Sequence, residues 1–491
     1  MSRTRRPIFL TMVIYIICSL IFLIMLDHGL SGAQNQTIGI VGLVIMGWCI
    51  ISSRMMYGKF FTLILMFEFS FYILTVGQTC LYAFNIPLDT TLDLYWSNSA
   101  VVVNKAYIYT FFCIVLFHIG TMIRPKRRFT IRRRYRDYGS YQYAEVEQCY
   151  GIDQEYQLEA DYTDAQRTFG WIVFFVSIIP FCVQEYNLLI SYLAFGYKAA
   201  YLSISGATSW SKIFSMIGDY FIFSLFMLLA AYKDDKLMRY IPSFIIIIIV
   251  FLNFAVGNRS EPICYLITLL WFYRRYSFSE SGQRITTAVT VVGIALLFLV
   301  IPIIGQTRNS GTLSIEAVSN AISGKDSALN AIKDTLITMG WTGFPLIKTM
   351  ELIPESFGFH YGESYFFALL ALIPNLLGGT HISVKYAGLP QWLKTTLEMS
   401  YGPGYSMPAE AYYNFGWVGI FVMIFFGRFV YKLINEDDDM ENSLKIFAKM
   451  GVFIVLFSIP RREMMTALRD GVYLVGFLYL GVKLWKTKFS K

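Results

Sequence analysis

Arginines beside the ends of apolar segments are the residues of this sequence best suited to a defined chemistry. An arginine side chain presents a planar fork that can bind a phosphate through two hydrogen bonds, and it stays charged at any relevant pH. Three separate segments that bring arginines to one membrane boundary would form a site for a phosphate attached to a lipid. The arginines concerned are Arg259, Arg308, Arg461, Arg462 and Arg469.

Within residues 461–470, a helical spacing places Arg462 and Arg469 on one face and Arg461 toward another side. Arg462 and Arg469 are therefore the better pair to share one ligand. The alternative is that each arginine reaches lipid headgroups or pairs with a nearby carboxylate. Those carboxylates would be Glu261, Glu463 and Asp470.

The turn at residues 257–262 holds Arg259 and Glu261 between two apolar runs, 241–256 and 263–273. Its glycine, asparagine and proline are typical of a turn. The runs reach only about 24 and 18 Å, less than a hydrocarbon core of about 30 Å. We therefore expect the turn to lie below the membrane surface, where an ionisable pair indicates a functional site. Glu261 is expected to orient Arg259.

Carboxylates are the candidates for a base that takes a proton from a hydroxyl group. Pro408 suits a first helical position, which places Glu410 in the first turn, where the helix dipole favours a charged carboxylate. Asn414 lies four residues on, on the same face, with Tyr413 beside it. These residues would offer an acceptor hydroxyl a base, an amide and an aromatic platform. The alternative is that Glu410 is only a charged residue at the start of a helix. Glu363 is the second candidate base.

Histidines and metal motifs add little to this pattern. His360 and His381 could serve as a base or a hydrogen-bond donor, although a loop histidine more often does neither. The segments predicted to face outward contain no D-x-D or H-E-x-x-H motif, and the sequence has no Walker loop or dinucleotide fingerprint. Its seven cysteines show neither a disulfide framework nor a zinc-ligand spacing. We therefore expect no cofactor and no catalytic metal.

The elements that must position these residues are membrane spans. The chain has 491 residues, of which 56% are hydrophobic and 15% charged, whereas soluble domains average about 25% charged residues. Several apolar runs approach or exceed 18 residues, and none alternates as a barrel strand would. The sequence thus predicts an all-α polytopic integral membrane protein. The net charge is +8, and the basic residues cluster in short loops beside these runs, as the positive-inside rule requires. The positive charge therefore does not indicate nucleic acid.

About twelve spans are expected, with both termini inside the cell. Because successive spans cross the membrane in alternate directions, this count places the arginines of interest outside. The first apolar run is too long for a signal peptide and is interpreted as a retained span. The expected spans are residues 8–26, 38–51, 60–83, 101–123, 169–190, 213–232, 241–256, 262–273, 285–304, 412–433, 447–459 and 472–485.

Three regions follow from this layout. Residues 1–304 would form a bundle of about nine spans, with a cytoplasmic loop at 124–168. Residues 305–410 would form a large extracytoplasmic loop of amphipathic helices that lie against the membrane, although a re-entrant or spanning pair there would preserve parity. Residues 411–491 would supply the last three spans.

Several motifs resemble those of bacterial oligosaccharide repeat-unit polymerases of the Wzy type, which build O-antigen or capsule. The resemblance covers residues 241–480, together with the late arginine-rich loop, while the first half resembles the family only in its span layout. The motifs are Gly257-Asn-Arg-Ser-Glu-Pro, Gly362-Glu-Ser-Tyr with a following Ile373-Pro-Asn, and Ala409-Glu-Ala-Tyr-Tyr-Asn-Phe-Gly-Trp-Val-Gly-Ile.

The resemblance implies a C-type glycosyltransferase architecture in the bacterial cytoplasmic membrane, and a metal-independent reaction at its outer face. A glycan carried on undecaprenyl pyrophosphate would be transferred to the non-reducing end of a new lipid-linked repeat unit, with release of undecaprenyl pyrophosphate. A flippase and a chain-length regulator are possible partners. Glu410 or Glu363 would act as the base, and the leaving pyrophosphate would be neutralised by Arg259, Arg308, Arg462 and Arg469.

Two other functions remain open from sequence. A ligase that transfers finished glycan from the same carrier would share the fold and the phosphate site. A flippase or transporter for lipid-linked sugars would favour internal repeats and broken helices in both halves, without a large one-sided loop. This sequence shows the opposite pattern, which favours the polymerase.

Overall fold

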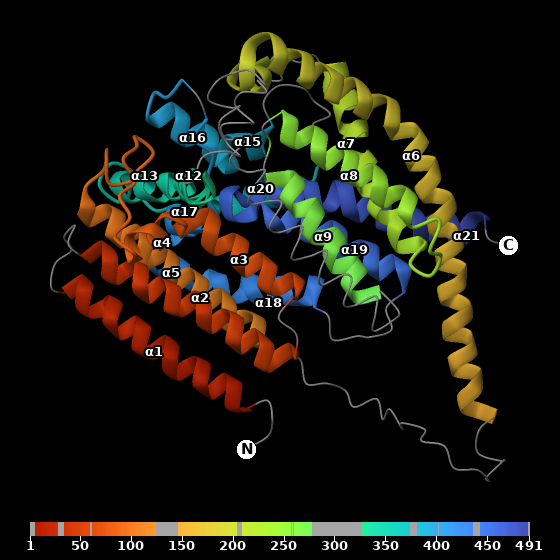
Figure 1. Cartoon of the computed structure of the whole chain (residues 1–491), viewed down its shortest axis with the longest axis horizontal. Coiled ribbons are helices and arrows are strands. Elements are labelled where there is room, and N and C mark those ends of the chain that lie inside the picture. The colour runs from red at the N-terminus through yellow and green to blue at the C-terminus, as the bar shows by residue number, and fades with distance from the viewer. Residues whose placement is uncertain are drawn as a thin grey trace.

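Helices make up the described part of the chain, in which no strand occurs (Figure 1). The computed structural model describes residues 5–27, 34–58, 61–123, 146–203, 209–256, 258, 260–276, 327–373, 381–400, 402–435 and 442–489. Among these residues, eight helices are long and apolar enough to cross a membrane, and Leu63–Val76 and Tyr240–Phe254 are shorter apolar helices. The eight are Pro7–Asp27, Asn35–Tyr57, Ala100–Met122, Tyr162–Ala194, Ile213–Ala231, Met407–Ile434, Ser443–Arg461 and Met464–Lys488.

The first group of helices packs side by side, at the lower left of Figure 1. Its closest contact joins α5 to α18 through glycines. A Cβ on Gly120 would lie 2.2 Å from the carbonyl oxygen of Ile424, and one on Gly427 would lie 2.1 Å from that of Phe117. Small residues of this kind let helix backbones approach closely in a membrane. The group comprises α1 (Arg5–Asp27), α2 (Asn35–Tyr57), α3 (Leu63–Val76), α5 (Ala100–Met122) and α18 (Val422–Ile434).

A second group of helices surrounds the polar cavity described below. The long helix α6 packs along α7, which also contacts α8 and α19, and α8 forms a hairpin with α9. The last candidate span is built from α20, a π-helical segment and α21 in succession. The bounds are α6 (Val146–Ser203), α7 (Ser209–Ala231), α8 (Tyr240–Ala255), α9 (Ser260–Tyr276), α19 (Ser443–Phe457), α20 (Met464–Asp470), η6 (Gly471–Gly476) and α21 (Phe477–Phe489).

Short helices between residues 327 and 400, here called the cap helices, gather at one end of the first group (Figure 1). Gln78 anchors them, because its side-chain amide donates to the carbonyl of Ile337 at 3.0 Å. Tyr405, which precedes α17 (Met407–Phe415), shares a 3.0 Å hydrogen bond with Thr349, and burial raises the pKa of its hydroxyl well above the usual value. The cap helices are α12 (Ser327–Gly340), η3 (Trp341–Gly343), α13 (Phe344–Leu352), α14 (Glu363–Leu370), α15 (Ile382–Ala387) and α16 (Leu389–Thr396).

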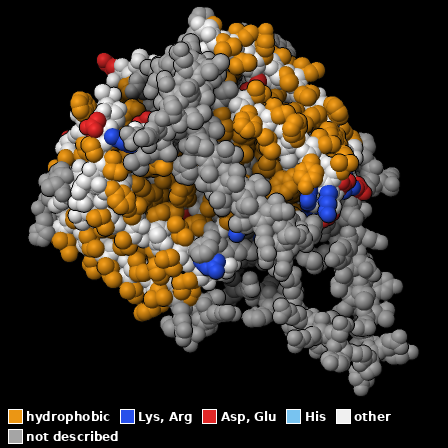
Figure 2. Space-filling view, in the orientation of Figure 1, with side chains coloured by type: hydrophobic (Ala, Val, Ile, Leu, Met, Phe, Trp, Pro, Cys, Tyr) orange, Lys and Arg blue, Asp and Glu red, His pale blue; other side chains and the backbone are white. Residues whose placement is uncertain are grey.

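Apolar side chains cover much of the described surface in Figure 2, over both groups of helices. Ile16, Phe175, Phe244, Phe251 and Phe425 are among the large hydrophobic residues left exposed. Contiguous apolar surface of this extent suits contact with lipid chains. The predicted class, an all-α polytopic membrane protein, is therefore confirmed.

Some predicted spans differ from the observed helices. The span expected at 60–83 is divided at Gly77 into α3 and α4 (Gln78–Ala83), although Gly77 itself keeps helical dihedral angles, with φ −54° and ψ −32°. A 3-10 segment, η4 (Gly416–Phe421), separates α17 (Met407–Phe415) from α18. The span expected at 285–304 lies outside the described residues.

Candidate active site

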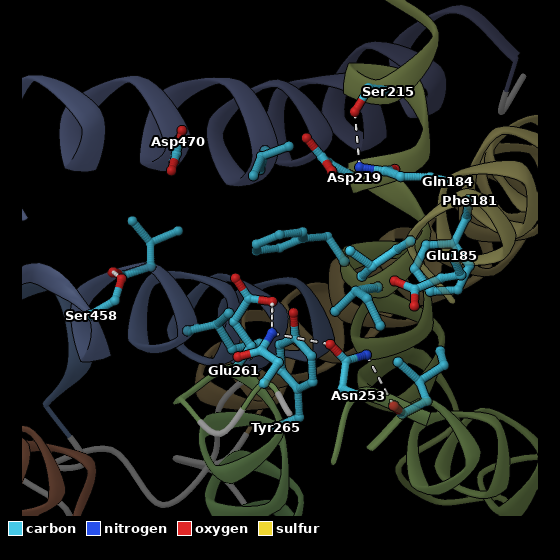
Figure 3. A pocket seen from close by; sticks show the side chains of 18 of the residues that line it. Phe181, Gln184, Glu185, Ser215, Asp219, Asn253, Glu261, Tyr265, Ser458 and Asp470 are labelled. Carbon is cyan, nitrogen blue, oxygen red and sulfur yellow. Dashed lines mark hydrogen bonds between the residues drawn. The ribbon is translucent and has the colours of Figure 1, made fainter. Parts of the chain in front are cut away.

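A cavity of about 810 Å³ lies among the helices of the second group (Figure 3). Its walls come from α6, α7, α8, α9, α19 and the segment around α20. Apolar side chains such as Phe223, Ile454 and Leu474 contribute to the lining. The ionisable residues of the described lining are Glu185, Asp219, Glu261, Arg462, Arg469 and Asp470.

Arg462 and Arg469 both line this cavity, and Asp470 lies between their charges. An Nη of Arg462 is 3.4 Å from one oxygen of Asp470, and Nε of Arg469 is 3.7 Å from the other. The exposed fractions of the two arginine side chains are 38% and 49%, which leaves part of each guanidinium open. The structure thus brings the two arginines together at one cavity, and it also shows the pairing with a nearby carboxylate that was the alternative expectation from the sequence.

The helical spacing used to pair these arginines is wrong at Arg462. The helix α20 begins only at Met464, and Arg462 precedes it in an extended conformation, with φ −132°. Its side chain reaches the cavity from that extended position. Arg461 points elsewhere and donates a 3.0 Å hydrogen bond to the hydroxyl of Ser260.

Glu261 belongs to the same charged cluster. One of its oxygens lies 3.9 Å from an Nη of Arg462, and the other accepts a 3.0 Å hydrogen bond from the side-chain amide of Asn258. Asn258 also donates to Asn253, at 3.1 Å (Figure 3). The predicted phosphate ligands Arg259 and Arg308 lie outside the described residues.

Glu185 and Asp219 are cavity residues that the sequence interpretation missed. They come from α6 and α7, on the wall that also holds Gln184 and Ser215, whose side chains share a 2.8 Å hydrogen bond (Figure 3). The available signal was the presence of a carboxylate inside a run apolar enough to span a membrane, which indicates a functional site. These two residues make the described lining richer in carboxylates than in arginines.

A second cluster lies on the cap, around His360. Its Nδ1 is 2.7 Å from an oxygen of Glu363, and its ring stacks on Tyr413 with centroids 4.0 Å apart. The ring of Trp392 makes a T-shaped contact with that of Tyr413, with ring centroids 4.9 Å apart. The side chains of His360 and Glu363 are 28% and 34% exposed. A histidine held by a carboxylate is a combination that can accept a proton.

Local backbone geometry fixes this cluster. Gly362 adopts a φ of 92°, a conformation that glycine accepts without strain, and α14 begins at the next residue, Glu363. The amide of His360 donates to the carbonyl of Tyr413 at 3.3 Å, and that of Tyr361 donates to the carbonyl of Asn414 at 2.8 Å. The turn is thus attached to the end of α17.

Glu410 is buried, with 1% of its surface exposed. One carboxylate oxygen accepts a 2.7 Å hydrogen bond from the hydroxyl of Ser364, and the other accepts one of 2.7 Å from the backbone amide of Met464. As predicted, it lies in the first turn of α17, beside Pro408 and after the capping hydroxyl of Ser406. The described lining of the cavity includes none of Glu410, Glu363 and His360.

Asn414 extends the contacts of Glu410. Its side-chain amide donates to the carbonyl of Glu410 at 2.8 Å, as expected for residues four apart, and to the hydroxyl of Ser364 at 2.7 Å. Its oxygen accepts from the amide of Gly362 at 3.0 Å. Glu410 and Asn414 therefore connect α17 to the turn that carries Glu363.

The carboxylates of the described lining do not belong to a group of side chains close enough to hold a metal ion together. Among the described residues, the group of side chains that could hold an ion is Cys49, Glu68 and His118, which lies elsewhere.

A bundle of apolar helices, with a charged cavity and a cap of short helices bearing a histidine–carboxylate pair, defines a polytopic membrane enzyme. A family model described as O-antigen polysaccharide polymerase Wzy matches residues 8–490. The chain belongs to this family, as its motifs predicted. It is therefore a membrane glycosyltransferase that polymerises oligosaccharide repeat units. No curated protein and no solved structure matches the chain.

Proposed function

We propose that the cavity binds the pyrophosphate of an undecaprenyl-pyrophosphate-linked glycan and that Arg462 and Arg469 are its ligands. The observation that carries this proposal is that both guanidinium groups line one cavity of about 810 Å³. Charge builds on the leaving pyrophosphate as the glycosidic bond breaks, and fixed cations stabilise it. Arg259 and Arg308 would add the positive charge that the described lining lacks.

The proposed acceptor base is His360, held by Glu363. If Nδ1–H donates to the carboxylate, the free electron pair on Nε2 can take a proton from the acceptor hydroxyl. The acceptor oxygen then bonds to the anomeric carbon of the donor glycan, and the bond from that carbon to the pyrophosphate breaks. Undecaprenyl pyrophosphate leaves with the bonding electrons.

Glu410 has a different role in this proposal from the base expected in the sequence. Both of its oxygens are occupied and its side chain is buried, so it is poorly placed to receive a proton from substrate. Its partners are Ser364, which follows Glu363, and Met464, which lies two residues after Arg462. Glu410 would therefore position the base and the phosphate ligand relative to each other.

Glu185 and Asp219 would accept hydrogen bonds from hydroxyl groups of the sugars. Carboxylates repel phosphate, so they suit the uncharged part of the substrate. Gln184 and Asn253 would add amide groups to this wall.

The membrane layout forms part of the proposal. We infer a C-type architecture of about twelve spans in the bacterial cytoplasmic membrane, with both termini inside and the arginines at the outer face. Residues 1–304 and 411–491 would supply the spans, and residues 305–410 the outer loop. A chain-length regulator and a flippase would be partners.

Purified protein incubated with synthetic undecaprenyl-pyrophosphate repeat units tests the proposal. A ladder of glycan lengths and release of the lipid pyrophosphate are expected. A matched substrate with a lipid monophosphate should give no ladder. Movement of labelled lipid across liposomes without any ladder would refute the reaction proposed here.

A further inference from the structure

A buried cluster of potential metal ligands lies in the first group of helices. Cys49 of α2, Glu68 of α3 and His118 of α5 are 0%, 0% and 1% exposed. Each offers one ligand atom, and these atoms lie within 4.8 Å of one another. They are separated by 19 and 50 positions in the sequence (68 − 49 and 118 − 68), so only helix packing brings them together.

Two polar contacts surround the imidazole of His118. Its Nε2 lies 2.8 Å from the hydroxyl of Ser52, which also lies within hydrogen-bond distance of the carbonyls of Trp48 and Cys49, at 2.7 and 3.2 Å. Its Nδ1 lies 2.7 Å from an oxygen of Glu68. A proton on Nδ1 accounts for the contact with Glu68, and a metal ion bound by both atoms is the alternative.

Two further contacts distinguish these cations. The second oxygen of Glu68 is buried and has no hydrogen-bond partner, which costs free energy in a dry interior. The sulfur of Cys49 is a member of the cluster and lies 3.1 Å from the hydroxyl of Tyr15, which can donate to a thiolate. A proton on His118 leaves the Glu68 oxygen without a partner, whereas a divalent ion can engage carboxylate, thiolate and imidazole together.

We propose that Cys49, Glu68 and His118 bind one zinc ion that joins α2, α3 and α5. Zinc favours a set of sulfur, nitrogen and oxygen ligands. A ligating histidine commonly donates its other N–H to a neighbouring acceptor, and the Ser52 hydroxyl, 2.8 Å from Nε2, would be that acceptor for a metal-bound His118. A thiolate and a carboxylate also balance the charge of the ion, which suits a membrane interior.

The role proposed for the ion is structural. None of its ligands lines the described cavity. Glu68 lies five residues into α3, and His118 four residues before the end of α5. Cys49 lies eight residues, or about 12 Å, before the end of α2. The site is thus near one end of the bundle, from which an ion can enter.

Metal analysis of the purified full-length protein tests the proposal directly. Protein expressed with added Zn²⁺ should contain about one zinc per chain, and Co²⁺ exchanged into it should give the absorption band of a thiolate-to-cobalt transition. Removal of the ion with a chelator should lower the melting temperature of the detergent-solubilised protein, and Zn²⁺ should restore it.

Substitutions localise the site. Cys49→Ser should abolish the cobalt band, and Glu68→Gln and His118→Ala should reduce zinc to background. Cys113→Ser is the matched control, because Cys113 is equally buried in α5 but outside the cluster, and it should retain both signals. Wild-type protein with neither zinc nor a cobalt band would overturn the proposal.

Discussion

The carboxylate of Glu410 accepts a 2.7 Å hydrogen bond from the backbone amide of Met464. This contact joins residues 54 positions apart and attaches α17 to the start of α20, which also carries Arg469. The other oxygen of Glu410 accepts a hydrogen bond from Ser364. Ser364 follows Glu363, the partner of the proposed base His360. A single buried side chain thus links the proposed proton acceptor to the proposed phosphate ligands.

Glu410→Ala should destabilise the protein and reduce polymerisation. It leaves the Ser364 hydroxyl and the Met464 amide without their acceptor, and each buried unpaired donor costs about 1–3 kcal/mol. Glu410→Gln, which preserves volume and one acceptor, should be affected less. Thermal unfolding in detergent and the glycan ladder measure the two effects. Glu355→Gln, on an exposed carboxylate, is the control, and full activity in Glu410→Ala would exclude the positioning role.

Arg462→Lys and Arg469→Lys should each retain charge but lose the guanidinium fork. Loss of a charged hydrogen bond costs about 1.5–3 kcal/mol, which corresponds to a roughly ten- to hundredfold lower kcat/KM for the lipid-pyrophosphate donor. Initial rates against donor concentration measure it. Arg167→Lys is the matched control, because Arg167 pairs with Asp164 outside the cavity lining. Unchanged rates in both cavity variants would remove them from the phosphate site.

His360→Gln should lower kcat by about 10²–10⁴-fold, the usual contribution of a general base. Glu363→Gln should lower it less, because the histidine remains while its orientation weakens. Rates at saturating donor and acceptor measure both effects. His381→Asn is the control: His381 only caps α15 through its contact with Ser383, and asparagine can replace the cap. Comparable losses at His360 and His381 would argue for a structural effect alone.

Asp219→Asn and Glu185→Gln should weaken acceptor binding more than they slow the reaction. Each replaces a carboxyl group that would bind sugar hydroxyl groups by an amide, so KM for the acceptor repeat unit should rise by roughly tenfold, equivalent to about 1.4 kcal/mol. Asp164→Asn provides the control on α6, at a carboxylate that is 76% exposed. An unchanged acceptor KM in folded Asp219→Asn protein would contradict the assignment.

Much of the fold class and some of the site followed from local sequence. Apolar runs that approach or exceed 18 residues predicted the membrane class. A helix formed by such a run can cross the bilayer because it satisfies its backbone hydrogen bonds internally. Pro408 before Glu410 predicted the start of α17, and the four-residue spacing predicted that Asn414 follows Glu410 on the same helix face. Short motifs in the second half predicted the family that the match over residues 8–490 confirmed.

Other features depended on which helices pack together, which local pattern does not encode. The burial of Glu410 arises from contacts with Ser364 and Met464, 46 and 54 positions away. Arg462 reaches the cavity from an extended segment rather than from a helical face. The inclusion of Glu185 and Asp219 in that cavity likewise needed α6 and α7 to be placed against α20.

The arginines show most plainly which features the sequence determined and which the tertiary structure decided. Their type determined what they can bind, since a permanently charged fork suits phosphate at any position in the chain. Tertiary structure decided which of the described ones share a cavity, because Arg462 and Arg469 line it while Arg461 bonds to Ser260. Cys49, Glu68 and His118 had no recognisable spacing, and only the packing of three helices brought their ligand atoms within 4.8 Å.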